Sequence, residues 1–100
     1  MPRRKQASLK RRIVITGIGA VTPLGNSARD TWTAIFRGQS GIGRITKFDA
    51  AGHRTQIAGE LKNFDPLNYL SNKELHKLDN FIVYALAAAT MAISDAKLHI

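Results

Sequence analysis

Residues 81–93 read Phe-Ile-Val-Tyr-Ala-Leu-Ala-Ala-Ala-Thr-Met-Ala-Ile, and this stretch decides the fold. Twelve of its thirteen residues are apolar or aromatic, and it contains no glycine or proline, so it is expected to be a helix. A helix that is apolar all round is either buried or in a membrane. A membrane span needs about 20 apolar residues, whereas Asp79 and Asp95 bound this run. We therefore expect a buried core helix that other elements cover.

The same helix is expected to begin upstream, at a capping box. Residues 71–74 (Ser-Asn-Lys-Glu) place a serine three residues before a glutamate. A single helix over residues 72–97 would be roughly 39 Å long at about 1.5 Å per residue. The remaining chain offers only two strands and one amphipathic helix to cover it. Such thin cover favours a piece of a larger fold or a chain that pairs with a partner.

The first part of the chain predicts one strand and one amphipathic helix. Residues 12–16 (Arg-Ile-Val-Ile-Thr) are a β-branched run stopped by Gly17, which is typical of a buried, parallel strand. A loop with three glycines and a proline follows over residues 17–25. Ser27 then precedes an acidic residue by three positions, and Gly38 occupies the place of a C-terminal helix stop. A short helix is expected between them.

The middle of the chain predicts a second strand. Residues 55–62 alternate, with Ile57 and Leu61 on one face, which indicates a half-buried edge strand. Residues 38–49 are expected to be a loop, and Asp65-Pro66 is expected to open a short helical turn. The order strand, helix, strand, helix predicts an α/β fold. A third strand would be expected after residue 100.

The positive charge is concentrated at the N-terminus. The formal net charge is +8, and six basic residues with no acid lie within the first twelve: Arg3, Arg4, Lys5, Lys10, Arg11 and Arg12. Residues 13–100 carry the other nine basic residues and all seven acids, for +2. We therefore expect a disordered basic leader over residues 1–11 and a partial domain over residues 12–100. A small basic nucleic-acid-binding module is the alternative, and salt-sensitive binding lost on deleting residues 1–12 would favour it.

Composition excludes several kinds of site. The leader lacks the apolar centre of a secretory signal. The chain has no cysteine, so these residues contain no thiolate metal site and no cysteine nucleophile. A cytoplasmic protein is consistent with both features.

Three weaker motifs also fail to assemble a site. A glycine pair, Gly17 and Gly19, opens like a dinucleotide-binding fingerprint, but Thr22 occupies the third glycine position. Ser40 is near a nucleophile-elbow pattern that Ile42 interrupts, so a turn residue is expected there. Metal-ligand spacing is missing for the histidines, His53, His76 and His99. No catalytic group, metal or cofactor is expected in this chain.

Several stretches carry one pattern in a fixed order: residues 13–26 (Ile-Val-Ile-Thr-Gly-Ile-Gly-Ala-Val-Thr-Pro-Leu-Gly-Asn), Trp32, residues 38–42, Phe48-Asp49, Ala58-Gly59 and residues 71–84. In this order and spacing they resemble the opening of the β-ketoacyl-[acyl-carrier-protein] synthases. The resemblance covers residues 11–100. Pro23 and the Lys-Leu-Asp-x-Phe run ending at Phe81 are more similar to the type II elongating enzymes.

The resemblance implies the N-terminal part of a thiolase-like fold, incomplete in this chain, and dimerisation of the whole enzyme through its sheets. It implies decarboxylative condensation of malonyl carrier protein with an acyl group loaded on a cysteine, assisted by two histidines and a backbone oxyanion hole. All of these groups would lie beyond residue 100. Fatty-acid elongation, a related polyketide pathway and a non-catalytic synthase-like partner subunit all stay open.

One functional feature carries over by position. The resemblance assigns docking of the acidic acyl carrier protein to Lys73, His76 and Lys77. His76 replaces an arginine common in the type II pattern, so its contact is expected to be weaker and pH-dependent. Lysines in the first turn of a helix oppose its dipole, which favours a partner there. A solvated helix end is the alternative.

Overall fold

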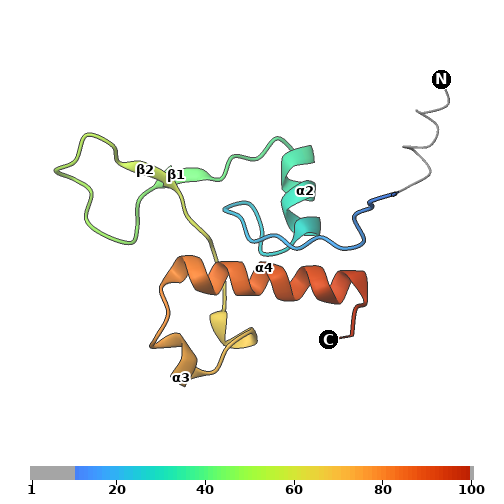
Figure 1. Ribbon diagram of the computed structural model, residues 1–100. Helices are drawn as coiled ribbons and strands as arrows, with labels where there is room; N and C mark the ends of the chain where they lie inside the picture. The colour runs from blue at the N-terminus through green and yellow to red at the C-terminus, as the bar shows by residue number, and fades with distance from the viewer. Residues whose placement is uncertain (1–10, 100) are drawn as a thin grey trace.

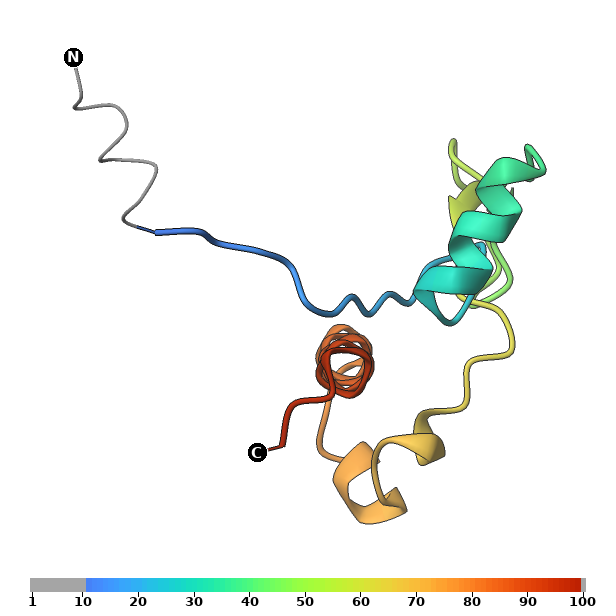
Figure 2. The same ribbon diagram turned by 90° about the vertical axis from the view of Figure 1, so that its right-hand side faces the viewer.

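The computed structural model describes residues 11–99. Its elements, drawn in Figure 1, are α2 (Ala28–Phe36), β1 (Ile42–Arg44), β2 (Ile57–Gly59), the 3-10 turn η1 (Pro66–Asn68), α3 (Asn72–Leu75) and α4 (Asn80–Ala96). The hairpin and α2 lie on one side of α4 and α3 on the other, as the turned view in Figure 2 also shows. The arrangement is open: the Cα radius of gyration is 19.0 Å, against about 13 Å for a compact chain of 100 residues.

The sequence signals around α2 are confirmed. The Ser27 side chain accepts a hydrogen bond from the Asp30 amide at 3.1 Å and so caps the first turn. Gly38 follows the helix with φ +72°, a conformation that favours glycine. Ala34 is the buried residue of this helix, and it faces the rest of the chain. Trp32 and Phe36 are exposed and contact each other, with ring centroids 5.8 Å apart.

The apolar stretch does form a helix, α4, but its expected burial on all sides is wrong within the described chain. Val83 and Ala87 are buried, with 3% and 0% of their surface exposed. Phe81 is 69% exposed, and Leu86 and Ile93 are exposed as well. The physical reason is that the other described elements leave part of the α4 surface uncovered.

Two glycines bring the chain against that covered side. A Cβ atom placed on Gly19 would collide with the Ala88 carbonyl and lie 2.7 Å from the Ala92 amide. A Cβ atom on Gly17 would lie 2.7 Å from the Cβ atom of Ala96. The three alanines follow each other at intervals of four, so they form one small-residue stripe on the helix. The glycines therefore serve close backbone packing on α4.

A tight turn connects this crossing segment to the hairpin. The Thr22 and Gly25 backbones bond each other at 2.8 and 3.1 Å. Pro23 sits against the hairpin base, where Cβ atoms on Gly41 and Gly59 would lie 2.8 and 3.0 Å from its ring. The Lys62 ammonium adds hydrogen bonds to three carbonyl oxygens, those of Pro23, Gly41 and Glu60, at 3.2–3.4 Å. These contacts fix the hairpin to the turn.

The predicted strand at residues 12–16 is not formed. The segment has no regular secondary structure, and the Ile13 side chain is 93% exposed. A strand requires a neighbouring strand to satisfy its backbone groups, and residues 11–99 place none beside it. The described sheet consists of β1 and β2, which are antiparallel, with Gly43 opposite Ala58.

The hairpin corrects two further predictions. Residues 38–49 were expected to be a loop, yet they contain β1. The second strand is shorter than predicted, since β2 has only three residues. Ile57, which was expected on the covered face, is 57% exposed. Period-two alternation locates such a strand, but only its partners determine which face is covered.

The long helix is broken into two. The capping box is present at α3, but α3 ends after one turn and α4 begins at Asn80. The Lys77 and Leu78 amides bond to carbonyls three residues back, which closes a turn instead of continuing the helix. Asp79 then adopts an extended conformation as the N-cap of α4. The short turn expected at Asp65-Pro66 is confirmed as η1.

The proposed leader falls mainly on residues 1–10, which lie outside the described residues. Arg11 and Arg12 are exposed. The boundary between leader and domain remains a prediction.

Candidate functional site

The capping box fixes the geometry of α3. The Ser71 hydroxyl accepts from the Glu74 amide at 3.2 Å, and the Glu74 carboxylate accepts from the Ser71 amide and hydroxyl at 3.0 Å each. The Ser71 amide, and then its hydroxyl, lower the pKa of Glu74 below its ordinary value. The Glu74 carboxylate is thus directed toward the start of α3.

The three predicted docking residues lie on α3 and the turn after it. Lys73, His76 and Lys77 are all exposed, whereas Leu75 and Leu78 are partly covered. Leu75 and Leu78 line a cavity under α3, so the inward and outward residues of this segment are separated. The structure therefore presents three basic or titratable side chains on one small projection of the chain, which we call the α3 projection (residues 71–79).

The dipole argument does not discriminate for these lysines, because the first and last turns of so short a helix coincide. Lys73 lies in the last turn of a four-residue helix, and His76 is its C-cap. Cations near the C-terminal end of a helix are favoured by its dipole. Exposure and position therefore carry the docking assignment, and helix polarity does not.

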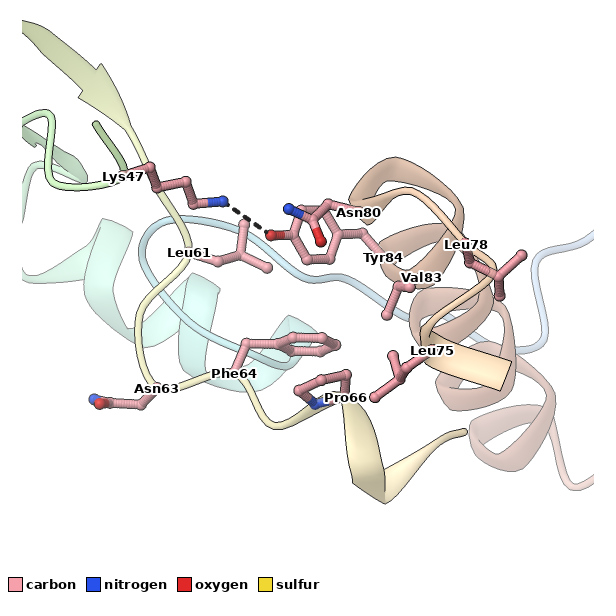
Figure 3. A pocket seen from close by; sticks show the side chains of 10 residues that line it. All are labelled: Lys47, Leu61, Asn63, Phe64, Pro66, Leu75, Leu78, Asn80, Val83 and Tyr84. Carbon is pink, nitrogen blue, oxygen red and sulfur yellow. Dashed lines mark hydrogen bonds between the residues drawn. The ribbon is translucent and has the colours of Figure 1, made fainter. Parts of the chain in front are cut away.

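The cavity under the α3 projection is shown in Figure 3 and has a volume of about 340 Å³. Its lining comprises Lys47, Leu61, Asn63, Phe64, Pro66, Leu75, Leu78, Asn80, Val83 and Tyr84. Phe64 packs edge-on against Tyr84, with ring centroids 5.4 Å apart, and its other face stacks on Tyr69. Six of the lining side chains are apolar, and the other four, Lys47, Asn63, Asn80 and Tyr84, carry polar groups.

Lys47 reaches this cavity from the hairpin. Its ammonium donates to the Tyr84 hydroxyl at 3.2 Å and lies 5.7 Å from the centre of that ring. The Glu60 carboxylate holds the backbone nearby, because it accepts from the Thr46 hydroxyl at 2.9 Å and from the amides of Thr46 and Lys47 at 3.1–3.3 Å. These bonds, led by that of the Thr46 hydroxyl, lower the pKa of Glu60.

Sequence reasoning missed Lys47, Glu60 and Thr46 as a group. Hydrogen bonds from Thr46 and Lys47 to the Glu60 carboxylate bring them together, although the register of β1 and β2 places residues 46 and 60 beyond opposite ends of the paired strands. Residues 42–46 (Ile-Gly-Arg-Ile-Thr) show no period-two alternation of apolar and polar residues. No local pattern in the sequence therefore indicates β1 or the group of residues that follows it.

The other motifs have structural roles. Gly17 and Gly19 face the α4 backbone, as described above. The Ser40 hydroxyl accepts from the Ile42 amide at 3.2 Å, as expected of a turn residue. Within residues 11–99, no three histidine, cysteine or acidic side chains gather as metal ligands would. In the same part of the chain, no helix combines the length and apolar character needed to cross a membrane.

Comparison with known proteins shows which family model and which relatives match the chain. The family model described as "Beta-ketoacyl synthase, N-terminal domain" matches residues 10–100. The chain is 45% identical over 89 residues to the 3-oxoacyl-[acyl-carrier-protein] synthase 2 of Synechocystis sp., covering 89% of this chain and 21% of that protein. It is 47% identical over 91 residues to the enzyme of the same name from Coxiella burnetii, covering 91% of this chain and 22% of that protein.

A solved structure agrees with the sequence matches. The structure titled "The ishigamide ketosynthase/chain length factor" superposes with a TM-score of 0.80 at 34% identity, over 89% of this chain and 22% of that one. The chain therefore spans about a fifth of the length of the relatives it matches. This superposition confirms the expected class, the N-terminal part of a thiolase-like α/β fold. Because the family model matches nearly all of the sequence, the chain belongs to the β-ketoacyl synthase family, within its N-terminal domain.

Proposed function

We propose that the chain is the N-terminal segment of a type II 3-oxoacyl-[acyl-carrier-protein] synthase of fatty-acid elongation. The observation that carries this proposal is 45–47% identity to two enzymes of that name over about nine tenths of the chain. The whole enzyme would be a cytoplasmic acyltransferase and a homodimer. In its reaction a cysteine takes the acyl group, malonyl carrier protein loses carbon dioxide, and the resulting carbanion forms the new carbon–carbon bond.

The 100 residues themselves would supply scaffold and docking, not chemistry. They contain no cysteine, so the nucleophile of the proposed reaction would come from the rest of the enzyme. We expect the purified 100-residue chain to form no β-ketoacyl product from acyl and malonyl carrier protein. A mass-spectrometric assay for that product checks this, and carrier-protein-dependent product formation would contradict it.

The docking role is assigned to the α3 projection. Lys73, His76 and Lys77 are exposed there, and Glu74, the acid among them, has its carboxylate bonded to Ser71. An acidic carrier protein would meet complementary charge, which affects encounter rate and orientation more than affinity. The His76 contact would be weaker than that of an arginine, whose planar guanidinium is always charged.

Charge reversal tests docking in the complete enzyme. Exposed ion pairs contribute only about 0.2–1 kcal/mol each, but the double variant Lys73→Glu/Lys77→Glu replaces attraction with repulsion. We expect the KM for carrier-bound substrate to rise about tenfold, which corresponds to ~1.4 kcal/mol. The increase should shrink at high salt. Replacing His76 with Arg should lower this KM, most clearly at neutral pH.

Two controls separate docking from damage to the fold. A small thioester substrate that lacks the carrier protein should react almost normally with the double variant. The matched charge reversal Arg29→Glu/Arg54→Glu changes two exposed basic residues outside the α3 projection and should leave the KM for carrier-bound substrate unchanged. Equal losses on both substrates would mean that the α3 projection does not dock the carrier protein.

A second candidate function keeps the family and removes the chemistry. The solved relative is titled a ketosynthase/chain length factor, so a synthase-like partner subunit without a catalytic cysteine is the alternative. Residues downstream of position 100 discriminate between the two. A cysteine and two histidines there would support the condensing enzyme, and loss of the cysteine would support the partner subunit.

A further inference from the structure

The cavity under the α3 projection combines an apolar wall with polar groups at one end. Leu61, Phe64, Leu75 and Val83 belong to the wall, and they come from three separate segments of the chain. Its volume of about 340 Å³ is at the small end of the range of roughly 300–1,000 Å³ found for ligand sites. The cavity is therefore large enough for a short apolar chain and too small for a large cofactor.

The polar end of the cavity is built around an ammonium group. The Lys47 ammonium has three donors, and one of them goes to the Tyr84 hydroxyl at 3.2 Å. Asn80 precedes Tyr84 by four residues on α4, so the two side chains share one face of that helix. Asn63 completes the polar lining, although Figure 3 shows its side chain directed away from Tyr84. The charged group is therefore positive, with a hydroxyl beside it.

The nearby Glu60 carboxylate does not neutralise the positive charge of Lys47 at this end of the cavity. The Glu60 carboxylate accepts hydrogen bonds from Thr46 and from the Lys47 backbone amide, and it is not among the residues that line the cavity. Its bonds hold the segment from which the Lys47 side chain extends. Ammonium and phenol donors together suit a carboxylate, because hydrogen bonds to ionised acceptors are the stronger kind.

We propose that this cavity binds a short carboxylate-headed amphiphile. Its carboxylate accepts from the Lys47 ammonium and the Tyr84 hydroxyl, and its unbranched tail lies along Leu61, Phe64 and Leu75. Such a ligand would lie under the α3 projection and would steady Leu75 from inside. The site is separate from the proposed carrier-protein docking and does not depend on that proposal.

Octanoate is the probe, added to the isotopically labelled 100-residue chain and followed by two-dimensional NMR. Saturable shifts are expected at Lys47, Tyr84 and Val83. Lys47→Met keeps the length of the side chain and removes its charge, so the dissociation constant should rise about tenfold. Lys97→Met makes the same change at an exposed lysine outside the cavity and outside the docking residues, and it should leave the constant unchanged. Tyr84→Phe keeps the ring and should weaken binding roughly threefold.

Ligand controls test the two halves of the probe. Octanol lacks the carboxylate and acetate lacks the tail, so both should bind at least tenfold more weakly than octanoate. Leu75→Phe fills the cavity from α3 and should abolish the saturable shifts, while the rest of the spectrum should still be that of a folded chain. The proposal is overturned if octanoate produces no saturable shift in the wild-type chain, if Lys47→Met binds it equally well, or if the shifts are confined to the exposed residues Phe81, Leu86 and Ile93.

Discussion

The two sides of α4 differ in what covers them. On one side the Gly17–Gly19 segment lies so close that even a methyl group on Gly19 would collide with the Ala88 carbonyl. Elsewhere on the helix, Phe81 near its N-terminal end and Leu86 and Ile93 on another face are exposed; we call these three residues the open side. The covered side carries small residues, which permit backbone contact, whereas the open side carries large apolar residues that the described chain leaves uncovered.

The open side gives the largest expected effect. Exposed apolar surface of this kind marks an interface or promotes aggregation, so we expect the 100-residue chain to self-associate through it. Replacing Phe81, Leu86 and Ile93 together with Gln should weaken association a hundredfold or more, because burial of each large side chain contributes about 1.5–3 kcal/mol and ~1.4 kcal/mol is tenfold. Sedimentation equilibrium measures the change.

A matched control checks that the effect comes from loss of apolar surface on the open side. Ser94 is exposed on α4, and Ser94→Gln adds the same side chain without removing apolar surface, so association should persist. Sedimentation of the triple variant like the wild-type chain would show that the open side is not the association surface. If the wild-type chain is a compact monomer that binds no hydrophobic dye, the contrast between the covered and the open side of α4 is wrong.

The covered side gives the next effect. Gly19→Ala should lower the free energy of unfolding by about 1–3 kcal/mol, as overpacking does, because the new methyl group must push the segment away from α4. Urea unfolding measures this loss. Gly43→Ala is the matched control, since a Cβ atom there has no neighbour within 4 Å. Equal losses in the two variants would mean that the close approach at Gly19 contributes nothing specific.

The smallest effect concerns the hydrogen bonds of Glu60 in the hairpin, next to the covered side. Hydrogen bonds from Thr46 and Lys47 lower the pKa of Glu60 from its ordinary value of 4.5. A carboxyl group whose pKa is lower in the folded chain stabilises it above pH 4.5, and this contribution is lost as pH falls through the folded value. We therefore expect the protection of the Thr46 and Lys47 amides, relative to the intrinsic exchange rate at each pH, to fall only below about pH 4.5.

Glu60→Gln tests that assignment. The amide side chain does not titrate in this range, so exchange at Thr46 and Lys47 should become faster at neutral pH and lose its acid dependence. Hydrogen exchange followed by NMR between pH 3 and 6 measures both, over the range around the ordinary carboxyl pKa of about 4.3. An unchanged acid transition in the variant would assign it to another carboxyl group.

Local sequence determined both ends of α2, the start of α3 and the helical state of the alanine-rich run. Ser27 and Gly38 bound α2, Ser71 starts α3, and the alanine-rich run forms α4. Helical hydrogen bonds join residues four apart, and caps use residues within one turn, so the relevant partners are already neighbours in the sequence. The family resemblance rested on the same kind of local motif. It assigned the proposed carrier-protein docking to Lys73, His76 and Lys77 without any knowledge of their surroundings.

Tertiary structure decided pairing, breaks and burial. The β-branched run at residues 12–16 stays unpaired, whereas the weaker segment at Ile42–Arg44 forms a strand because β2 lies beside it. The helix break places the basic residues on their own projection, and the Lys47–Tyr84 contact joins positions 37 residues apart. The glycines and the alanines that they contact are farther apart still in sequence, as Gly19 and Ala88 are. Strand pairing, side-chain contacts and the covered side of a helix depend on such distant residues, and a local pattern does not specify which of them will meet.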